Sequence, residues 1–139
     1  MTARPAYLPS EIEFTEPLLD LTAPDPVDAR RATRRLSRDG GLSRDAEEGL
    51  VGAVSEVVTN AALHGRPPVR VLGWMADGEA VITVTDHGPG PSDPDVGLRP
   101  ATRDQGEGGF GLWLAHQLCD EVVMGCHQDL FTVRLVARS

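Results

Sequence analysis

The chain has 139 residues, of which 40% are hydrophobic, and a formal net charge of −8. This length favours one domain, residues 1–139, with a core of its own. The negative charge disfavours nucleic acid, whose phosphates require clustered Lys and Arg. No apolar run reaches the roughly 18 residues of a membrane span. The chain start lacks the apolar block of a secretory signal, so we expect a cytoplasmic protein with reduced cysteines.

The first part of the chain predicts short elements and one helix. Residues 1–10 are expected to form a flexible terminus, and the alternation of Ile12 and Phe14 with polar residues predicts a short strand. Two prolines in residues 20–26 predict a turn, which ends in an Asp-Pro pair suited to a helix start. The helix predicted over 27–38 carries five arginines. These form either a solvated face or a surface for docking a partner.

The helix predicted over residues 45–64 is the longest of the chain. Its apolar residues recur at helical spacing and form a stripe that can face a core, and Gly65 ends it. Glu56 and Asn60 are four residues apart, so their side chains lie one turn apart beside this stripe. They are either solvated helix residues or a reactive pair, because a carboxylate can accept a proton and an amide oxygen can ligate a hard cation.

The second half of the chain predicts two hairpins separated by a loop and a helix. The loop of residues 90–107 is rich in proline, aspartate and glycine, and loops of this length are usually functional or mobile. The helix after it is expected to bury Leu112, Ala115, Leu118 and Cys119. The predicted strands cover residues 69–74, 80–85, 121–125 and 130–136.

Glycines precede the last predicted helix. Residues 106–111 match the G-x-G-x-x-G pattern, but loop residues precede them and too few residues follow for a dinucleotide-binding domain. Glycines before a helix nevertheless let backbone amides approach an anion, and the helix N-terminus favours negative charge. These glycines therefore suit the phosphates of a nucleotide.

A second glycine-rich segment follows the strand that ends at Asp86. The segment is either a simple turn or part of a base pocket. In a pocket, the Asp86 carboxylate can accept a hydrogen bond from an exocyclic amine, and Gly88 and Gly90 let a flat base lie against the backbone. The reactive helix, the base pocket and the phosphate loop then follow one another along the chain.

These three segments resemble the N, G1 and G2 boxes of the GHKL superfamily of ATP-binding proteins, at residues 56–60, 86–90 and 108–112. The pattern Glu-x-x-Thr-Asn-Ala with a following His64 resembles the bacterial anti-sigma-factor serine kinases of the switch-protein-kinase type, and residues 111–120 resemble actinobacterial members. The resemblance implies an α+β fold: a single-domain, two-layer sandwich of a mixed, mostly antiparallel sheet with helices packed on one face.

The resemblance also implies roles for the matching residues. Glu56 would be the catalytic base, Asn60 would ligate Mg²⁺, and Asp86 would bind the adenine amino group of ATP. Residues 90–107 would be the ATP lid. The other ATP contacts would come from Gly88, Gly90, Gly108, Gly109, Phe110, Gly111, Leu112, Thr132 and His64, the last of which is otherwise only a helix-end cap.

The function implied is that of a regulatory serine/threonine kinase and anti-sigma factor. It would sequester a sigma factor, phosphorylate a STAS-type anti-anti-sigma protein and form a homodimer. Three alternatives stay open: a non-catalytic ATP-binding interaction module, a small ATPase, and the catalytic fragment of a larger sensor kinase. Histidine kinases commonly carry Asn where this chain has Glu56, which argues against phosphorylation of histidine.

Overall fold

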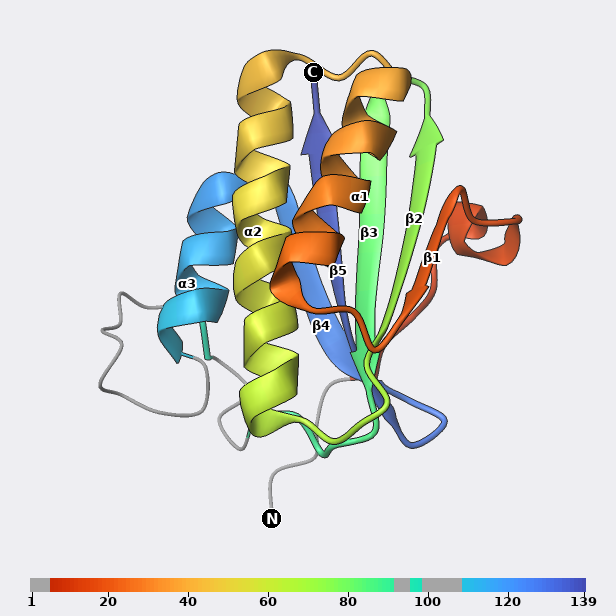
Figure 1. Cartoon of the computed structure of the whole chain (residues 1–139). Helices are drawn as coiled ribbons and strands as arrows, with labels where there is room; N and C mark the ends of the chain where they lie inside the picture. The colour runs from red at the N-terminus through yellow and green to blue at the C-terminus, as the bar shows by residue number, and fades with distance from the viewer. Residues whose placement is uncertain (1–5, 92–95, 99–108) are drawn as a thin grey trace.

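The protein is an open antiparallel sheet covered on one face by three helices (Figure 1). A computed structural model describes residues 6–91, 96–98 and 109–139. The strand order is β1-β2-β3-β5-β4. The elements are the 3-10 helix η1 (Glu11–Phe14), β1 (Leu19–Thr22), α1 (Pro26–Asp39), α2 (Arg44–His64), β2 (Arg70–Ala76), β3 (Glu79–Asp86), α3 (Gly109–Leu118), β4 (Glu121–His127) and β5 (Leu130–Arg138).

This architecture confirms the predicted two-layer α+β fold. All four neighbouring strand pairs are antiparallel, and among the described residues the parallel component is one isolated bridge between Ala6 and Cys126. Within the same part of the chain, no helix is long and apolar enough to cross a membrane.

The local sequence explains where the two long helices begin and where α2 ends. The Asp25 carboxylate accepts a hydrogen bond from the Asp28 amide at 2.8 Å and caps α1. The Ser43 hydroxyl accepts one from the Ala46 amide at 3.2 Å and caps α2. The Gly65 amide closes α2. The predicted apolar stripe of α2 is buried against the sheet, as its members show: Leu50, Val54, Val57, Val58 and Ala61.

Two tight hairpins fix the register of the sheet. Asp77 and Gly78 join β2 to β3, and Gln128 and Asp129 join β4 to β5; all four residues have positive φ, between 50° and 78°. Two-residue turns of this kind match the twist of paired strands. As a consequence of the β3–β5 register, Asp86 at the end of β3 lies opposite Phe131 near the start of β5.

Three of the five α1 arginines bind residues of α2. Arg34 and Arg38 lie 2.9 and 3.2 Å from the carboxylate of Glu47, which is only 4% exposed. Arg30 donates to the Ser55 hydroxyl at 3.0 Å. These arginines therefore join the two helices. This role differs from both expectations, a solvated face and a surface for docking a partner.

Three local expectations are wrong. The alternation at residues 12–14 belongs to η1, where the Glu13 carboxylate accepts from the Ser10 amide at 2.7 Å, and this local cap outweighs the strand pattern. The expected turn over 20–26 contains most of β1, because this segment pairs with the edge of β2. Leu118 is 37% exposed at the end of α3.

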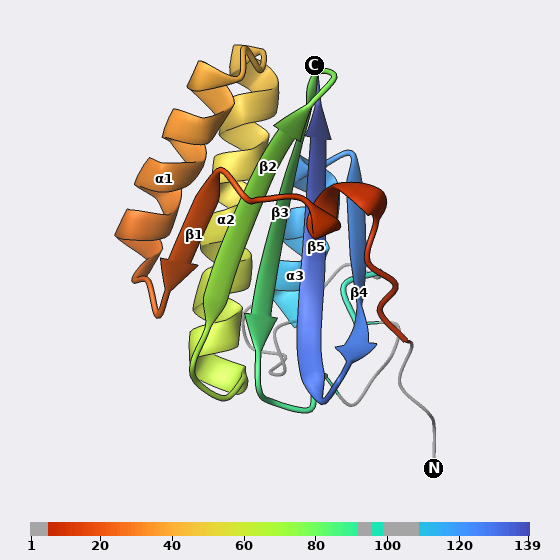
Figure 2. The same ribbon diagram turned by 90° about the vertical axis from the view of Figure 1, so that its right-hand side faces the viewer.

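The N-terminal segment, residues 6–17, crosses the sheet face opposite the helices (Figure 2). Ile12 packs against a small cluster on that face formed by Trp74, Val81 and Val136, each less than 5% exposed. The Trp74 indole N–H donates to the Thr15 carbonyl at 3.1 Å. Within the terminus expected to be flexible, residues 1–10, Tyr7 is 3% exposed, while residues 1–5 lie outside the described residues.

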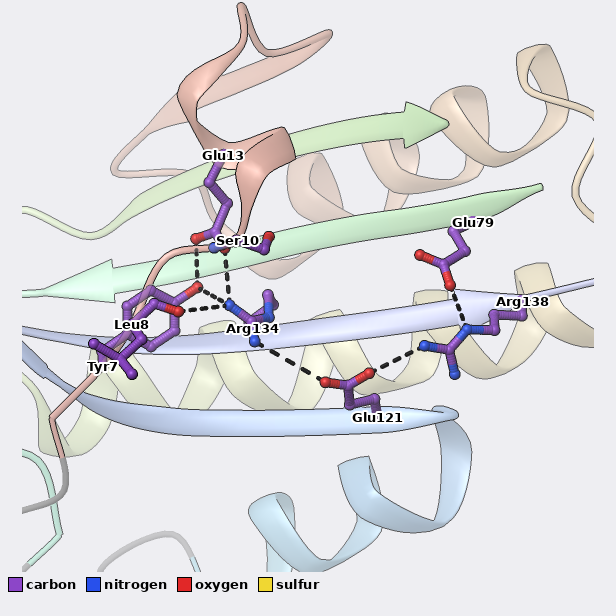
Figure 3. A network of polar contacts seen from close by, with 8 residues as sticks. All are labelled: Tyr7, Leu8, Ser10, Glu13, Glu79, Glu121, Arg134 and Arg138. Atoms are coloured by element: carbon purple, nitrogen blue, oxygen red, sulfur yellow. Dashed lines mark hydrogen bonds and ion pairs between the residues drawn. The ribbon is translucent and has the colours of Figure 1, made fainter. Parts of the chain in front are cut away.

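Polar contacts also bind this segment to β5 (Figure 3). The Tyr7 hydroxyl donates to the Glu13 carboxylate. The Arg134 guanidinium lies 2.9 Å from that carboxylate and 5.3 Å from the centre of the Tyr7 ring. Burial alone would raise the pKa of Glu13, but hydrogen bonds from Tyr7, Ser10 and Arg134 outweigh burial and hold this pKa below its ordinary value.

Candidate functional site

The predicted N and G1 boxes meet at one end of the molecule, where α2 and β3 end and α3 begins (Figure 1). A cavity of about 260 Å³ lies there. Its lining combines three polar side chains with small and apolar residues: Asn60, Ala61, His64, Gly65, Asp86, Pro89, Gly90, Pro91 and Phe131. A concave site with a few convergent polar groups is typical of a small-molecule site.

Asp86 is fixed by the backbone around it. Its side chain is 5% exposed, and its Oδ1 accepts hydrogen bonds from the Gly88 amide at 2.6 Å and the Arg66 amide at 3.3 Å. The His87 amide donates to the Arg66 carbonyl at 2.9 Å, which joins the end of α2 to the turn after β3. Among the described residues, both hydrogen bonds to the carboxylate use Oδ1, which leaves Oδ2 for a ligand.

Glycine is required next to Asp86 and next to Phe131. A Cβ atom at Gly65 would lie 2.5 Å from the Asp86 Cγ and Oδ2 atoms. Gly90 has a φ of +74°, and a Cβ there would lie 2.5 Å from the Phe131 ring. Gly88 also lies against Oδ1 of Asp86. Backbone therefore packs directly on both side chains, and any larger residue would displace them.

The predicted reactive helix contributes to the same region. Asn60 and His64 line the cavity, while Glu56 lies one turn before Asn60 and is partly buried. A Cβ on Gly111, in the first turn of α3, would lie 3.5 Å from the Glu56 carbonyl oxygen. The start of α3 thus packs directly on the turn that carries Glu56. Leu112 is fully buried, so its position is explained by the core.

The other residues predicted to contact ATP do not line the cavity or lie partly outside the described residues. Gly109 begins α3, whereas Gly108, the Phe110 side chain and most of loop 90–107 lie outside the described residues. Thr132 is not among the residues that line the cavity. Its hydroxyl lies 3.1 Å from that of Thr85, on the sheet face opposite the helices, because the side chains of a strand alternate.

The cavity lining includes two residues that the sequence did not predict as part of the site, Gly65 and Phe131. The sequence predicts Gly65 only as the end of a helix, whereas in the structure this glycine also permits the close approach of a buried carboxylate. Phe131 precedes Thr132 by one residue and therefore faces the helices, where it belongs to the main core and lines the cavity. Pairing β5 with β3 at the sequence level, with Asp86 as the reference, would have placed this aromatic ring at the site.

Comparisons with solved structures and with models of protein families identify similar proteins. The crystal structure of the RsbU and RsbW domains of Rv1364c from Mycobacterium tuberculosis has a TM-score of 0.62 and 22% identity, over 88% of this chain and 33% of that one. The chain thus spans about a third of that structure, and the likeness shows a shared fold. The mycobacterial sensor histidine kinase MprB has a TM-score of 0.47 and 22% identity, over 86% of this chain and 99% of that one.

No match was found among curated proteins. The sequence model described as the histidine kinase-like ATPase domain matches residues 22–136, which include the whole cavity lining, β2, β3 and β4, and most of β5. The chain belongs to the histidine kinase-like ATPase domain family.

Proposed function

We propose that the protein is a Mg²⁺- and ATP-dependent serine/threonine kinase that acts as an anti-sigma factor. It would bind a sigma factor and phosphorylate a STAS-type anti-anti-sigma protein. The observation that carries the proposal is the placement of Glu56 on the same helix face as Asn60, beside a cavity that Asn60 and Asp86 both line. A carboxylate that can act as a base thus lies one helical turn from the nucleotide cavity.

The cavity fits the base of a nucleotide. Asp86 offers Oδ2 to an amino group, and the close approach of Gly65 and Gly90 holds Asp86 and the Phe131 ring in the cavity wall. The start of α3 reaches this region next to Glu56, and a helix N-terminus favours phosphate. When bound, ATP would supply the phosphoryl group, and Mg²⁺ would neutralise its charge.

The metal would be held mainly by phosphate and water. In the described part of the chain, no group of three or more His, Cys, Asp or Glu side chains could hold a metal ion. Mg²⁺ usually keeps several waters and takes one or two protein oxygens with substrate phosphates. The single amide oxygen of Asn60, at the cavity wall, suits that role.

Glu56 would act on the partner's hydroxyl. As the seryl or threonyl oxygen forms its bond to the γ-phosphorus, the bond between that phosphorus and the leaving ADP oxygen breaks, and the hydroxyl proton passes to Glu56. Positioning supplies most of the catalysis in such transfers. A carboxylate at this position, where histidine kinases commonly carry Asn, supports a hydroxyl acceptor.

The test is phosphoryl transfer from labelled ATP to a purified STAS-type partner. The wild type is expected to transfer label in an acid-stable form, as for a phosphoserine or phosphothreonine, whereas acid-labile label would indicate histidine. Glu56→Gln should abolish transfer and keep ATP affinity within about threefold, because removing a base leaves ground-state binding unchanged. Glu48→Gln, an equivalent change on the exposed side of α2, is the control.

Other outcomes favour the alternatives. ATP binding without transfer would support a non-catalytic module, and phosphate release without any partner would support an ATPase. Loss of ATP binding in Glu56→Gln would assign Glu56 a structural role. Sigma-factor binding and self-association are measured separately, by co-sedimentation and by light scattering, because neither depends on the chemistry of Glu56.

A further inference from the structure

We propose that Phe131 is a specificity-determining residue that forms the aromatic wall of the base pocket. The inference rests on the nucleotide site proposed above and identifies how the site holds the base beyond the hydrogen bond to Asp86. The wall is apolar, so the base would be held there by ring contact and not by a second hydrogen bond.

The position of Phe131 follows from the β3–β5 register. It lies directly opposite Asp86, so the ring and the carboxylate are neighbours on the same face of the sheet. The side chain is 7% exposed, belongs to the main hydrophobic core and still lines the cavity. A base whose amino group donates a hydrogen bond to Oδ2 of Asp86 therefore lies beside the Phe131 ring.

Neighbouring residues fix the ring in place. Gly90 approaches so closely that a Cβ would lie 2.5 Å from the ring, and Pro89 and Pro91 flank this glycine in the lining. The ring therefore has little room to turn away when a ligand enters. A wall of this kind is preorganised, which lowers the cost of binding.

The chemistry of the wall predicts selectivity. The three polar side chains of the lining are Asn60, His64 and Asp86, of which the first two belong to α2. Near the base end, Asp86 only accepts hydrogen bonds when ionised, and Phe131 can neither donate nor accept. A base that presents a carbonyl oxygen to Asp86 in place of an amino group would face an acceptor, and the neighbouring Phe131 ring offers no donor, so amino-substituted purines are favoured.

The test compares adenosine and ADP binding to wild type, Phe131→Ala and Phe131→Leu by calorimetry. Loss of the ring should weaken both ligands by the same factor, about 5- to 150-fold, which is the range for losing an aromatic stacking partner. Phe131→Leu keeps core volume and should lose less. Phe14→Ala, a change to a phenylalanine that is 79% exposed, is the control. Thermal melting of each variant shows that the fold persists.

Distinct results would overturn the inference. Unchanged ADP affinity in a folded Phe131→Ala protein would refute it and leave the proposed nucleotide site intact. A loss confined to ADP, with adenosine unaffected, would place the effect at the phosphates and refute it as well. If the wild type bound neither ligand, the proposed function would fail and the inference with it.

Discussion

Replacing Gly65 with alanine should disable the nucleotide site without adding or removing any charge. The new Cβ would lie 2.5 Å from the Asp86 Cγ and Oδ2 atoms, whereas ordinary contacts begin near 3.4 Å. The carboxylate must therefore move by about 0.9 Å. Asp86 has little freedom to do so, because it is buried and its Oδ1 is held by the Gly88 amide at 2.6 Å.

The size of the effect follows from the bonds that this movement breaks. A hydrogen bond to a charged group contributes about 1.5–3 kcal/mol. If the displaced carboxylate loses one such bond to the ligand, affinity falls about 10- to 150-fold. Strain between the added methyl group and Asp86 should also lower the melting temperature of the variant, since two neighbouring backbone amides lose their acceptor.

Calorimetric titration with Mg²⁺ and ATP measures this loss. The matched control is Gly41→Ala, because Gly41 has a positive φ of +76° and open space around its Cβ position. That variant should lose some stability through backbone strain and keep its affinity. Wild-type ATP affinity in a folded Gly65→Ala protein would show that the position of the Asp86 carboxylate does not govern binding, and the assigned base pocket would be wrong.

Two further predictions concern groups with shifted pKa values. Because the pKa of Glu13 is lowered in the folded state, its contribution to stability is complete above about pH 5 and is lost as pH falls through the folded pKa. Denaturant unfolding of wild type and Glu13→Gln should therefore differ most at neutral pH and converge in acid; a constant difference would contradict this. Burial, reinforced by the charge of Asp120, raises the pKa of the Cys119 thiol to about 12. Iodoacetamide at pH 8 should accordingly label Cys126→Ala, which keeps only Cys119, far more slowly than Cys119→Ala, and equal rates would contradict that burial.

Periodicity predicted the long elements well because packing reinforces local preference there. The apolar stripe of α2 is buried as its spacing indicates, and both hairpins turn at the predicted positions. Helix geometry alone also placed Glu56 and Asn60 on one face, and the end of a strand placed Asp86 at its turn. These inferences need only the repeat of one element.

Features that depend on contacts between distant segments could not be predicted from the sequence. β1 has four residues and is stabilised by pairing with β2, which no local pattern reveals. Gly65 acquires its role from a carboxylate 21 residues later (86 − 65), which lies against it only once α2 and β3 have packed. Phe131 and Thr132 differ by a single position, so their opposite placements depend on the exact parity of β5 relative to the helices.

The N-terminal segment has a consequence for how the protein is prepared. A chain trimmed to the family match at residues 22–136 would lack this segment and nearly all of β1. Trp74, Val81 and Val136 would lose their contact with Ile12, and β2 would become an edge strand with one side unpaired. An exposed apolar surface beside an edge strand with unpaired backbone amides favours aggregation, because strands of different molecules can pair there. The choice of the first residue would thus determine whether the purified protein stays in solution or aggregates.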